Sequence, residues 1–221
     1  MLYTPSIRFA AHRPTGAKLA LKPVHVWGIR VRLQVGCRAR DLALFDLALD
    51  SKLRGCDLVM LRVSDLLSPG GVKRRVVVLQ RKTGRPVQFE VTEQTRRSIA
   101  AWLECKLLGF DDWLFPSRMK RGWHLSTHQY ARLVDKRVCL LGLDPAAYGT
   151  HNLRRTKVAL LYKKTGNLRA CQLLLGHTKL ESTVRYLGVE VDDALELSEA
   201  REDDGPMVFT KRQITIAADL E

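Results

Sequence analysis

The stretch LLLGHTKLESTVRYL, which runs from Leu173 to Leu187, contains a glycine–histidine pair followed by a tyrosine. His177 precedes Tyr186 by nine residues (186 − 177 = 9). A tyrosine usually packs its ring while its hydroxyl finds a partner, and its phenol, with a pKa near ~10, is a poor nucleophile without help. Tyr186 is therefore either an ordinary packed aromatic residue or a nucleophile. The second interpretation requires other residues in the chain that would activate its hydroxyl.

A second motif, THNLRRTKVALL, places His151 three residues before Arg154. At the start of a helix, this spacing puts both side chains on one face. Thr150 is the predicted N-cap, and the free amides of a helix N-terminus favour phosphate. An isolated H-x-x-R motif is weak evidence for a functional site because it often occurs by chance. Its significance therefore depends on the other motifs in the chain.

Two further cations occupy distinctive positions. LRGCDLVMLRVSDL predicts a short helix that opens with Arg54, whose planar guanidinium can bind phosphate oxygens in a bidentate manner. The β-branched runs RRVVVLQ and RPVQFEV bracket RKTG, which predicts a β-hairpin with Lys82 near its tip. Lys82 could there reach into a groove and present a proton donor. Taken singly, each of these residues is more often a solvated cation.

The remaining sequence predicts helices around one small sheet. ARDLALFDLALDSKL has Leu42, Phe45 and Leu49 at the spacing of one helix face. STHQYARLVDKRVCLLG begins with Ser126 and has Gln129 three residues later, which is a capping-box pattern. The predicted fold class is α+β: a mainly helical domain with a small antiparallel β-sheet.

Domain boundaries follow from this pattern. We expect an arm leading into a helix over residues 1–35, the main domain over residues 36–200 and an acidic tail over residues 201–221. Apolar residues at helical spacing also predict a short amphipathic segment over residues 190–200.

Charge selects a class of partner. The formal net charge is +14, from 37 basic and 23 acidic residues. Residues 190–221 hold ten acids and three bases, so residues 1–189 hold 34 bases and 13 acids, a net of +21 (34 − 13). This excess favours a polyanionic partner, nucleic acid first, with steeply salt-dependent affinity. A basic protein without such a partner would show the same balance.

Several other classes are disfavoured. No apolar run approaches the ~18 to 20 residues of a membrane-spanning helix, and the N-terminus lacks the apolar region of a signal peptide. The sequence offers no P-loop and no convincing carboxylate cluster for two metal ions, so we expect no metal and no cofactor. The cysteines are scattered without a C-x-x-C pair, which predicts reduced thiols in a cytoplasmic protein. They are Cys37, Cys56, Cys105, Cys139 and Cys171.

The order and setting of these motifs resemble the tyrosine recombinase (phage integrase) family. The resemblance spans about Arg40 to Gly188 and is carried by LRGCDLVMLRVSDL, QRKTGRPVQFEV, THNLRRTKVALL and LLLGHTKLESTVRYLGV, of which the last two are the most specific. It implies a tyrosine recombinase catalytic domain that cleaves and rejoins DNA through a 3′-phosphotyrosine. The implied catalytic residues are Arg54 and Arg154 on the scissile phosphate, Lys82 as general acid, His151 and His177 as assistants, and Tyr186 as nucleophile.

The resemblance also implies partners. We expect double-stranded DNA, self-association on DNA up to a tetrameric synapse, and an accessory DNA-bending or core-binding protein, because too few residues precede the catalytic helices for the family's usual core-binding domain. Residues 190–200 would dock onto a neighbouring subunit. Four further basic residues are candidates for DNA binding: Arg81, Arg85, Lys163 and Lys164. Their positive charges fit a solvated basic surface equally well.

Two other functions remain open from the sequence. One is a non-catalytic DNA-binding regulator with a recombinase fold, which the intact set of motifs disfavours. The other is a relaxing enzyme of the type IB topoisomerase kind, which shares the chemistry but needs no paired sites. The sequence does not select the DNA target, because few side chains read bases and most basic residues contact phosphates.

Overall fold

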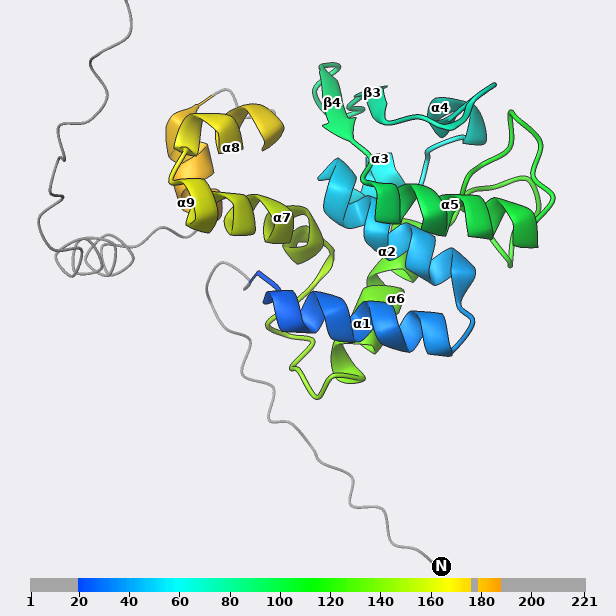
Figure 1. Ribbon diagram of the computed structural model, residues 1–221, viewed down its shortest axis with the longest axis horizontal. Coiled ribbons are helices and arrows are strands. Elements are labelled where there is room, and N and C mark those ends of the chain that lie inside the picture. The colour runs from blue at the N-terminus through cyan, green and yellow to red at the C-terminus, as the bar shows by residue number, and fades with distance from the viewer. Residues whose placement is uncertain (1–19, 176–178, 188–221) are drawn as a thin grey trace, which may run out of the picture. The chain divides into compact units, whose positions relative to one another are not determined.

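A computed structural model describes residues 20–175 and 179–187 (Figure 1). Its elements are α1 (Pro23–Val35), α2 (Ala39–Ser51), α3 (Gly55–Leu58), α4 (Val63–Leu66), β1 (Leu67–Ser68), β2 (Gly71–Val72), β3 (Arg75–Leu79), β4 (Pro86–Glu90), α5 (Glu93–Cys105), α6 (Thr127–Cys139), α7 (Thr150–Thr165), α8 (Leu168–Leu175) and α9 (Leu180–Leu187). The predicted amphipathic segment 190–200, the acidic tail 201–221 and His177 lie outside the described residues.

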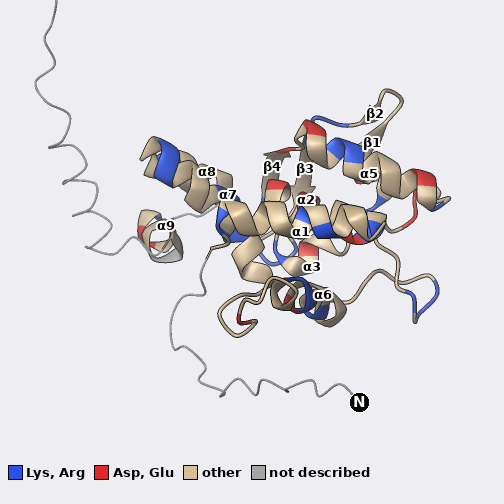
Figure 2. Ribbon diagram, turned by 60° about the horizontal axis from the view of Figure 1, so that its bottom comes forward, with Lys and Arg blue, Asp and Glu red and all other residues tan. Residues whose placement is uncertain are grey.

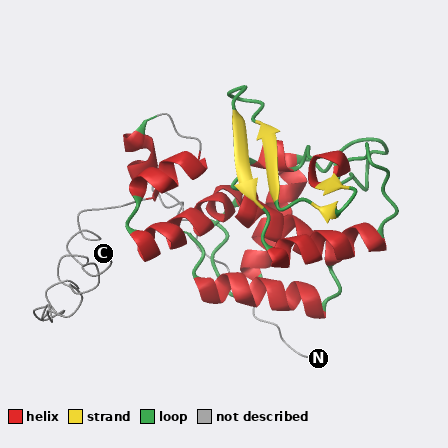
Figure 3. Ribbon diagram, turned by 45° about the horizontal axis from the view of Figure 1, so that its top comes forward, coloured by secondary structure: helices red, strands yellow, loops and turns green. Residues whose placement is uncertain are grey.

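Two small antiparallel sheets accompany the helices, which confirms the predicted α+β class (Figure 3). The expected sheet is the β3–β4 hairpin, in which Val77 lies opposite Gln88. The second, β1–β2, was not predicted, because two-residue strands are too short to show an alternating pattern. The chain turns between these strands at residues 69–70, and Gly71, the first residue of β2, has a φ of +95°, which suits glycine.

Helix α2 is the central element of the core. It packs against α1, α5, α7 and β4, and Figure 1 shows it running between α1 and α5. The predicted face of Leu42, Phe45 and Leu49 packs in the core, and burial extends further, to every residue from Ala43 to Ser51. Neighbouring elements surround α2, so its polar residues are buried as well, including the carboxylates of Asp46 and Asp50.

Helix α1 begins at Pro23, within the arm and helix expected over residues 1–35. Proline is favoured at the first helical position because its missing N–H would have no partner there. The helix contributes Ile29 and Leu33 to the core. Arg30 Nε donates to Asp46 Oδ1 at 2.7 Å, which attaches α1 to α2 and gives that buried carboxylate a charged partner.

Helix ends were predicted with mixed success. Ser126 Oγ accepts a hydrogen bond from Gln129 N at 3.1 Å, which confirms the N-cap of α6. Gly166, with φ of +64°, terminates α7 in the left-handed conformation that glycine favours at a helix C-terminus. The prediction for Thr150 was wrong: Gly149 is the N-cap and Thr150 is the first helical residue, so its hydroxyl does not cap α7.

Candidate active site

Arg54 and the β3–β4 hairpin are joined through one buried amide side chain. Arg54 is the N-cap residue of α3, so the predicted opening of this short helix is confirmed. Its Nη1 donates to Gln80 Oε1 at 2.7 Å, and Thr83 Oγ1 donates to the same oxygen at 3.0 Å. Gln80 is buried and immediately precedes the turn that carries Lys82. The position of Arg54 is therefore coupled to the conformation of the hairpin turn.

The turn is fixed by three further hydrogen bonds. Gln80 O accepts from Gly84 N at 2.7 Å, and Gln80 N donates to Arg85 O at 2.9 Å. The buried carboxylate of Asp57, on α3, accepts from the backbone N of Arg81 at 3.0 Å. The predicted hairpin is confirmed, with Lys82 exposed at its turn and held close to the helix that begins after Arg54.

His151 and Arg154 occupy different environments on α7. His151 is exposed in the first turn, whereas Arg154 is buried, with 4% of its surface accessible. Arg154 Nη2 donates to the carbonyl oxygen of Leu175 at 2.8 Å. Leu175 is the last residue of α8, and a cation is favoured at a helix C-terminus. Arg154 thus ties α7 to the point where the chain enters residues 176–178, which include His177.

A partly buried ion pair connects the segments that carry the two arginines. Lys157 Nζ lies 2.6 Å from Asp50 Oδ1. Asp50 lies in the last turn of α2, four residues before Arg54 in the chain, and Lys157 follows Arg154 by three residues, about one turn along α7. Asp50 Oδ2 also accepts from the N and Oγ1 of Thr92, at 2.8 and 2.7 Å. One carboxylate therefore joins α2, α7 and the N-terminus of α5.

The environment of this ion pair shifts two pKa values. Burial alone would raise the pKa of Asp50, but hydrogen bonds and charge from Lys157 and hydrogen bonds from Thr95 and Thr92 outweigh it and hold the pKa low. Lys52, at the C-cap of α2, is only 5% exposed. Burial, reinforced by the charge of Lys157, lowers the pKa of Lys52 to about 8, against the opposing charges of Asp50 and Glu90.

We expect Lys52→Met to stabilise the protein at pH 7. Because the pKa of Lys52 falls from 10.5 to about 8 on folding, the unfolded chain binds more protons between these values, and stability rises with pH across that window. Removing the charge should raise the free energy of unfolding by about 3 kcal/mol below pH 8, and the gain should shrink toward pH 10. Urea unfolding of both proteins from pH 7 to 10 measures it; a variant that is less stable at every pH would contradict it.

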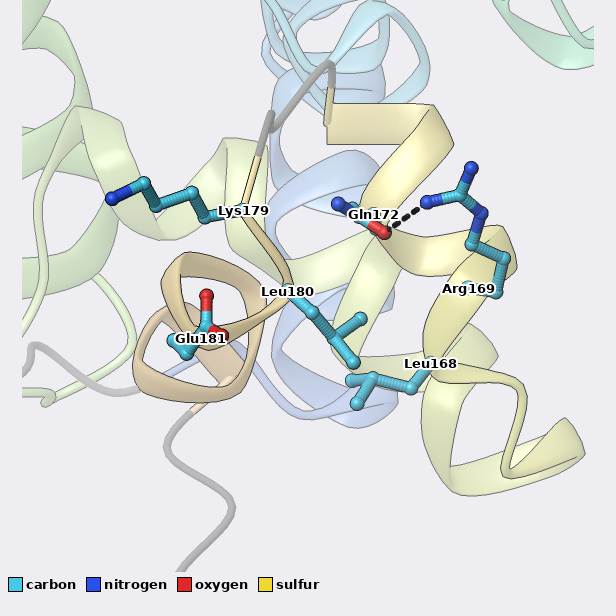
Figure 4. A pocket seen from close by; sticks show the side chains of 6 residues that line it. All are labelled: Leu168, Arg169, Gln172, Lys179, Leu180 and Glu181. Carbon is cyan, nitrogen blue, oxygen red and sulfur yellow. Dashed lines mark hydrogen bonds between the residues drawn. The ribbon is translucent and has the colours of Figure 1, made fainter.

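Helices α8 and α9 hold the last part of the predicted site. Tyr186 lies in α9 by its backbone, and α9 packs against α8 and α7. A surface pocket of about 760 Å³ lies at this helix pair (Figure 4). Arg169 Nη1 donates there to Gln172 Oε1 at 2.7 Å, and Gln172 is buried. The six lining residues are Leu168, Arg169, Gln172, Lys179, Leu180 and Glu181.

The four predicted DNA-binding side chains fall into two groups. Arg81 and Arg85 flank Lys82 on the exposed hairpin turn. Lys163 and Lys164 are exposed in the last turn of α7. The twelve residues from His151 to Lys163 correspond to roughly 18 Å along the helix axis, so the structure places these lysines away from His151.

Residues 20–175 and 179–187 lack a membrane-spanning helix and a metal-binding cluster. In these ranges no helix is long and apolar enough to cross a membrane. The same ranges hold no group of three or more His, Cys, Asp or Glu side chains that could bind a metal ion.

Comparisons with known proteins place this fold in a family. The family model described as the phage integrase family matches residues 34–192. The chain belongs to the phage integrase family. The match spans Arg54, the hairpin, α7 and Tyr186, which are the segments that the sequence motifs singled out.

Relatives within the phage integrase family differ in how much of their length is matched. The probable integrase/recombinase YoeC of Bacillus subtilis is 28% identical over 153 residues, which cover 69% of this chain and 80% of YoeC. The tyrosine recombinase XerD of Rhizobium meliloti is 30% identical over 157 residues, which cover 70% of this chain and 49% of XerD. The chain therefore spans about half the length of that XerD.

A solved structure supports the fold assignment. The site-specific recombinase XerH, in a post-cleavage complex with its palindromic difH substrate, superposes with a TM-score of 0.67 at 19% sequence identity. The superposition covers 84% of this chain and 54% of the XerH chain. At this identity the likeness concerns the fold.

The motifs did not reveal the residues that hold this site together. Gln80, Asp50 and Lys157 were not predicted, although they connect the arginine-bearing segments to their neighbours. The available signal was a charged residue, Asp50, within the apolar run of α2. Such a residue is expected to have a charged partner when buried, but the pattern does not identify that partner.

Proposed function

We propose that this chain is a site-specific DNA recombinase that cleaves and rejoins DNA strands through a 3′-phosphotyrosine, without metal or ATP. The observation that carries the proposal is the family match over residues 34–192, which includes all six predicted catalytic positions. The coupling of Arg54 to the hairpin turn and of Arg154 to the end of α8 supports it. The six residues are Arg54, Lys82, His151, Arg154, His177 and Tyr186.

The proposed step is a transesterification. Tyr186 Oη attacks the scissile phosphorus, the bond between Oη and phosphorus forms, and the bond from phosphorus to the 5′-oxygen breaks. The phenol proton passes to His151, because an imidazole can accept and release protons near neutral pH. The leaving 5′-oxygen takes a proton from the Lys82 ammonium group. One phosphodiester replaces another, so attack by a second 5′-hydroxyl can reseal the strand without an energy source.

The arginines stabilise the charge that develops in this step. Negative charge accumulates on the two non-bridging oxygens, and guanidinium groups already in place meet it without reorganisation. We assign this role to Arg54 and Arg154, with His177 as a further donor. Loss of one such group typically lowers the rate by ~10²-fold or more. The same positive charge favours the phenolate form of Tyr186 and makes it a better nucleophile.

The proposed partner is double-stranded DNA. A net charge of +14 favours a polyanion, and the XerH structure of this fold contains its DNA substrate. We further propose that several copies assemble on DNA, up to a tetrameric synapse, that residues 190–200 dock onto a neighbouring copy, and that an accessory DNA-bending or core-binding protein assists. Residues 36–200 would form the catalytic unit, preceded by residues 1–35 and followed by the acidic tail 201–221. The proposed site of action is the cytoplasm.

Trapping of a covalent adduct tests this function. Nicked duplexes with candidate sites from DNA flanking the gene are incubated with the protein in EDTA without ATP, then separated under denaturing conditions. We expect a denaturation-resistant protein–DNA species that protease removes. Strand exchange between two duplexes then distinguishes a recombinase from a relaxing topoisomerase. Tight binding without an adduct on any duplex would contradict the proposal and favour a DNA-binding regulator.

A further inference from the structure

Lys52 combines two features that are unfavourable for a lysine. It is the C-cap residue of α2 and has a φ of +53°, a left-handed conformation that glycine adopts most readily. Its side chain is also buried, although a lysine is almost never fully buried unless it is paired. Residues held in sparsely populated backbone conformations cluster at functional sites. Lys52 is therefore a candidate for a role beyond those of the six catalytic residues.

Charged groups on three elements act on Lys52. Asp50 on α2 and Glu90 on β4 attract its ammonium group, whereas Lys157 on α7 repels it more strongly than either carboxylate attracts it. Asp50 is already paired with Lys157, and within the described part of the chain no carboxylate forms an ion pair with Lys52. The N-terminus of α5 meets Asp50 through uncharged threonine side chains. Protonated Lys52 thus adds a second cation beside Lys157 where α2 and α7 pack together.

Lys52 and Lys157 lie next to the segments that carry the two proposed catalytic arginines. Residues 52–54 are the whole connection between α2 and α3, so a displacement of Lys52 reaches Arg54 within two residues. Lys157 follows Arg154 by three residues, about one turn along α7. Helix α7, whose basic residues are blue in Figure 2, packs against α2. Repulsion between the two lysines therefore acts between the segments that carry the two arginines.

Loss of one proton from Lys52 removes this repulsion. Burial and the charge of Lys157 lower the pKa of Lys52 to about 8, so its ammonium group is mostly protonated at pH 7 and mostly neutral at about pH 9. The ion pair between Lys157 Nζ and Asp50 Oδ1, at 2.6 Å, then has no competing cation beside it. Neutral Lys52 therefore favours close packing of α2 against α7, and protonated Lys52 opposes it.

We propose that Lys52 is a positioning residue for Arg54 and Arg154: its protonated side chain loosens the packing of α2 against α7, and loss of the proton tightens that packing and speeds DNA cleavage. The inference rests on the proposed function for the roles of the two arginines, whereas the loosening itself rests on burial and charge. Guanidinium groups stabilise developing charge best when they are already held in place, so looser packing slows cleavage. Lys52 acts through the arginines and does not contact DNA.

The pH dependence of cleavage in Lys52 variants tests this role. Adduct formation on nicked duplex is measured in a single turnover, with protein in excess, from pH 7 to pH 10. Each variant's rate is divided by the wild-type rate at the same pH, which cancels the titration of groups that both proteins share. Lys52→Met should form adduct about fivefold faster than wild type at pH 7, and the ratio should fall toward one at pH 10.

Two further variants separate charge from shape. Lys52→Arg carries a charge that it cannot lose, so its ratio to wild type should be near one at pH 7 and should fall to about one fifth at pH 10. The matched control is Lys106→Met, which removes an exposed lysine at the C-cap of α5 and should give a ratio of one throughout. A ratio for Lys52→Met that stays the same at every pH would overturn the inference, because a purely structural effect of the substitution does not follow protonation.

Amide hydrogen exchange without DNA separates this inference from the proposed function. Peptides from α2, α3 and α7 should exchange faster in wild type than in Lys52→Met at pH 7, with a smaller difference at pH 9. If wild type forms adduct, this result together with the pH-dependent ratio supports both proposals, and either effect without the other overturns the role of Lys52. If wild type forms no adduct, the exchange difference supports loosening by Lys52 and contradicts the recombinase proposal, whereas equal exchange contradicts both.

Discussion

Tyr186→Phe is expected to abolish covalent adduct formation while leaving duplex binding close to wild type. The substitution removes one hydroxyl and keeps the ring, so it deletes the nucleophile with little change in packing. No other group on phenylalanine can attack phosphorus, and the loss should therefore be complete rather than partial. The measurement is adduct trapping on nicked duplexes, with anisotropy on the same duplexes to record binding. The result depends on the nucleophile alone, because the arginines remain in place.

Tyr162→Phe is the matched control for this experiment. Tyr162 lies on α7, within the same three-helix region as Tyr186, and it is partly exposed. We expect Tyr162→Phe to form adduct at the wild-type rate. Adduct formation by Tyr186→Phe would show that another side chain attacks the phosphate, and equal losses in both variants would indicate damage to the helices. The first outcome would reject Tyr186 as the nucleophile, and the second would leave that assignment without support.

Local features of the site were predictable from the sequence because short-range rules determine them. The hairpin that presents Lys82 follows from two β-branched runs around Thr-Gly, and Gly84 adopts a positive φ of +62°, which suits glycine in the turn. The opening of α3 at Arg54 and the end of α7 at Gly166 are equally local. Each of these features depends on residues that are close together in the sequence, so residue spacing and backbone preferences determine it.

Long-range contacts of the site were not predictable in this way. Asp50 and Lys157 are 107 residues apart, and either could have been a solvated charge by its spacing alone. Arg154 was predicted to face phosphate, but the pattern gave no indication that its guanidinium also binds the end of α8. The burial of α2 on all sides was missed for the same reason, because it depends on α1, α5 and α7 meeting around one helix. The spacing of apolar residues describes each helix separately and does not show which other helices pack around it.

Asp50→Ala is expected to lower the free energy of unfolding by about 3 kcal/mol at pH 7. Removing one partner of a buried ion pair leaves the other charge uncompensated, which costs about 3 to 5 kcal/mol. The lower end applies because the Lys157 side chain is 36% exposed, so water partly solvates it after the change. The substitution also removes the carboxylate that accepts from Thr92 and that opposes the charge of Lys52. Urea unfolding measures the loss.

Two further variants show whether the loss comes from the charge pair. Asp50→Ala with Lys157→Ala should recover part of the stability, because Lys157 no longer lacks its partner. Glu93→Ala breaks exposed pairs with Arg96 and Arg97 and should cost at most about 1 kcal/mol. The pKa of Asp50 is lowered on folding, so its contribution is present above the ordinary aspartate pKa of ~3.9 and disappears as acid protonates the folded state. The free energies of unfolding of wild type and Asp50→Ala should therefore converge at low pH. A difference that stayed constant from pH 7 to pH 3 would mean that the carboxylate charge does not help to hold α2 and α7 together.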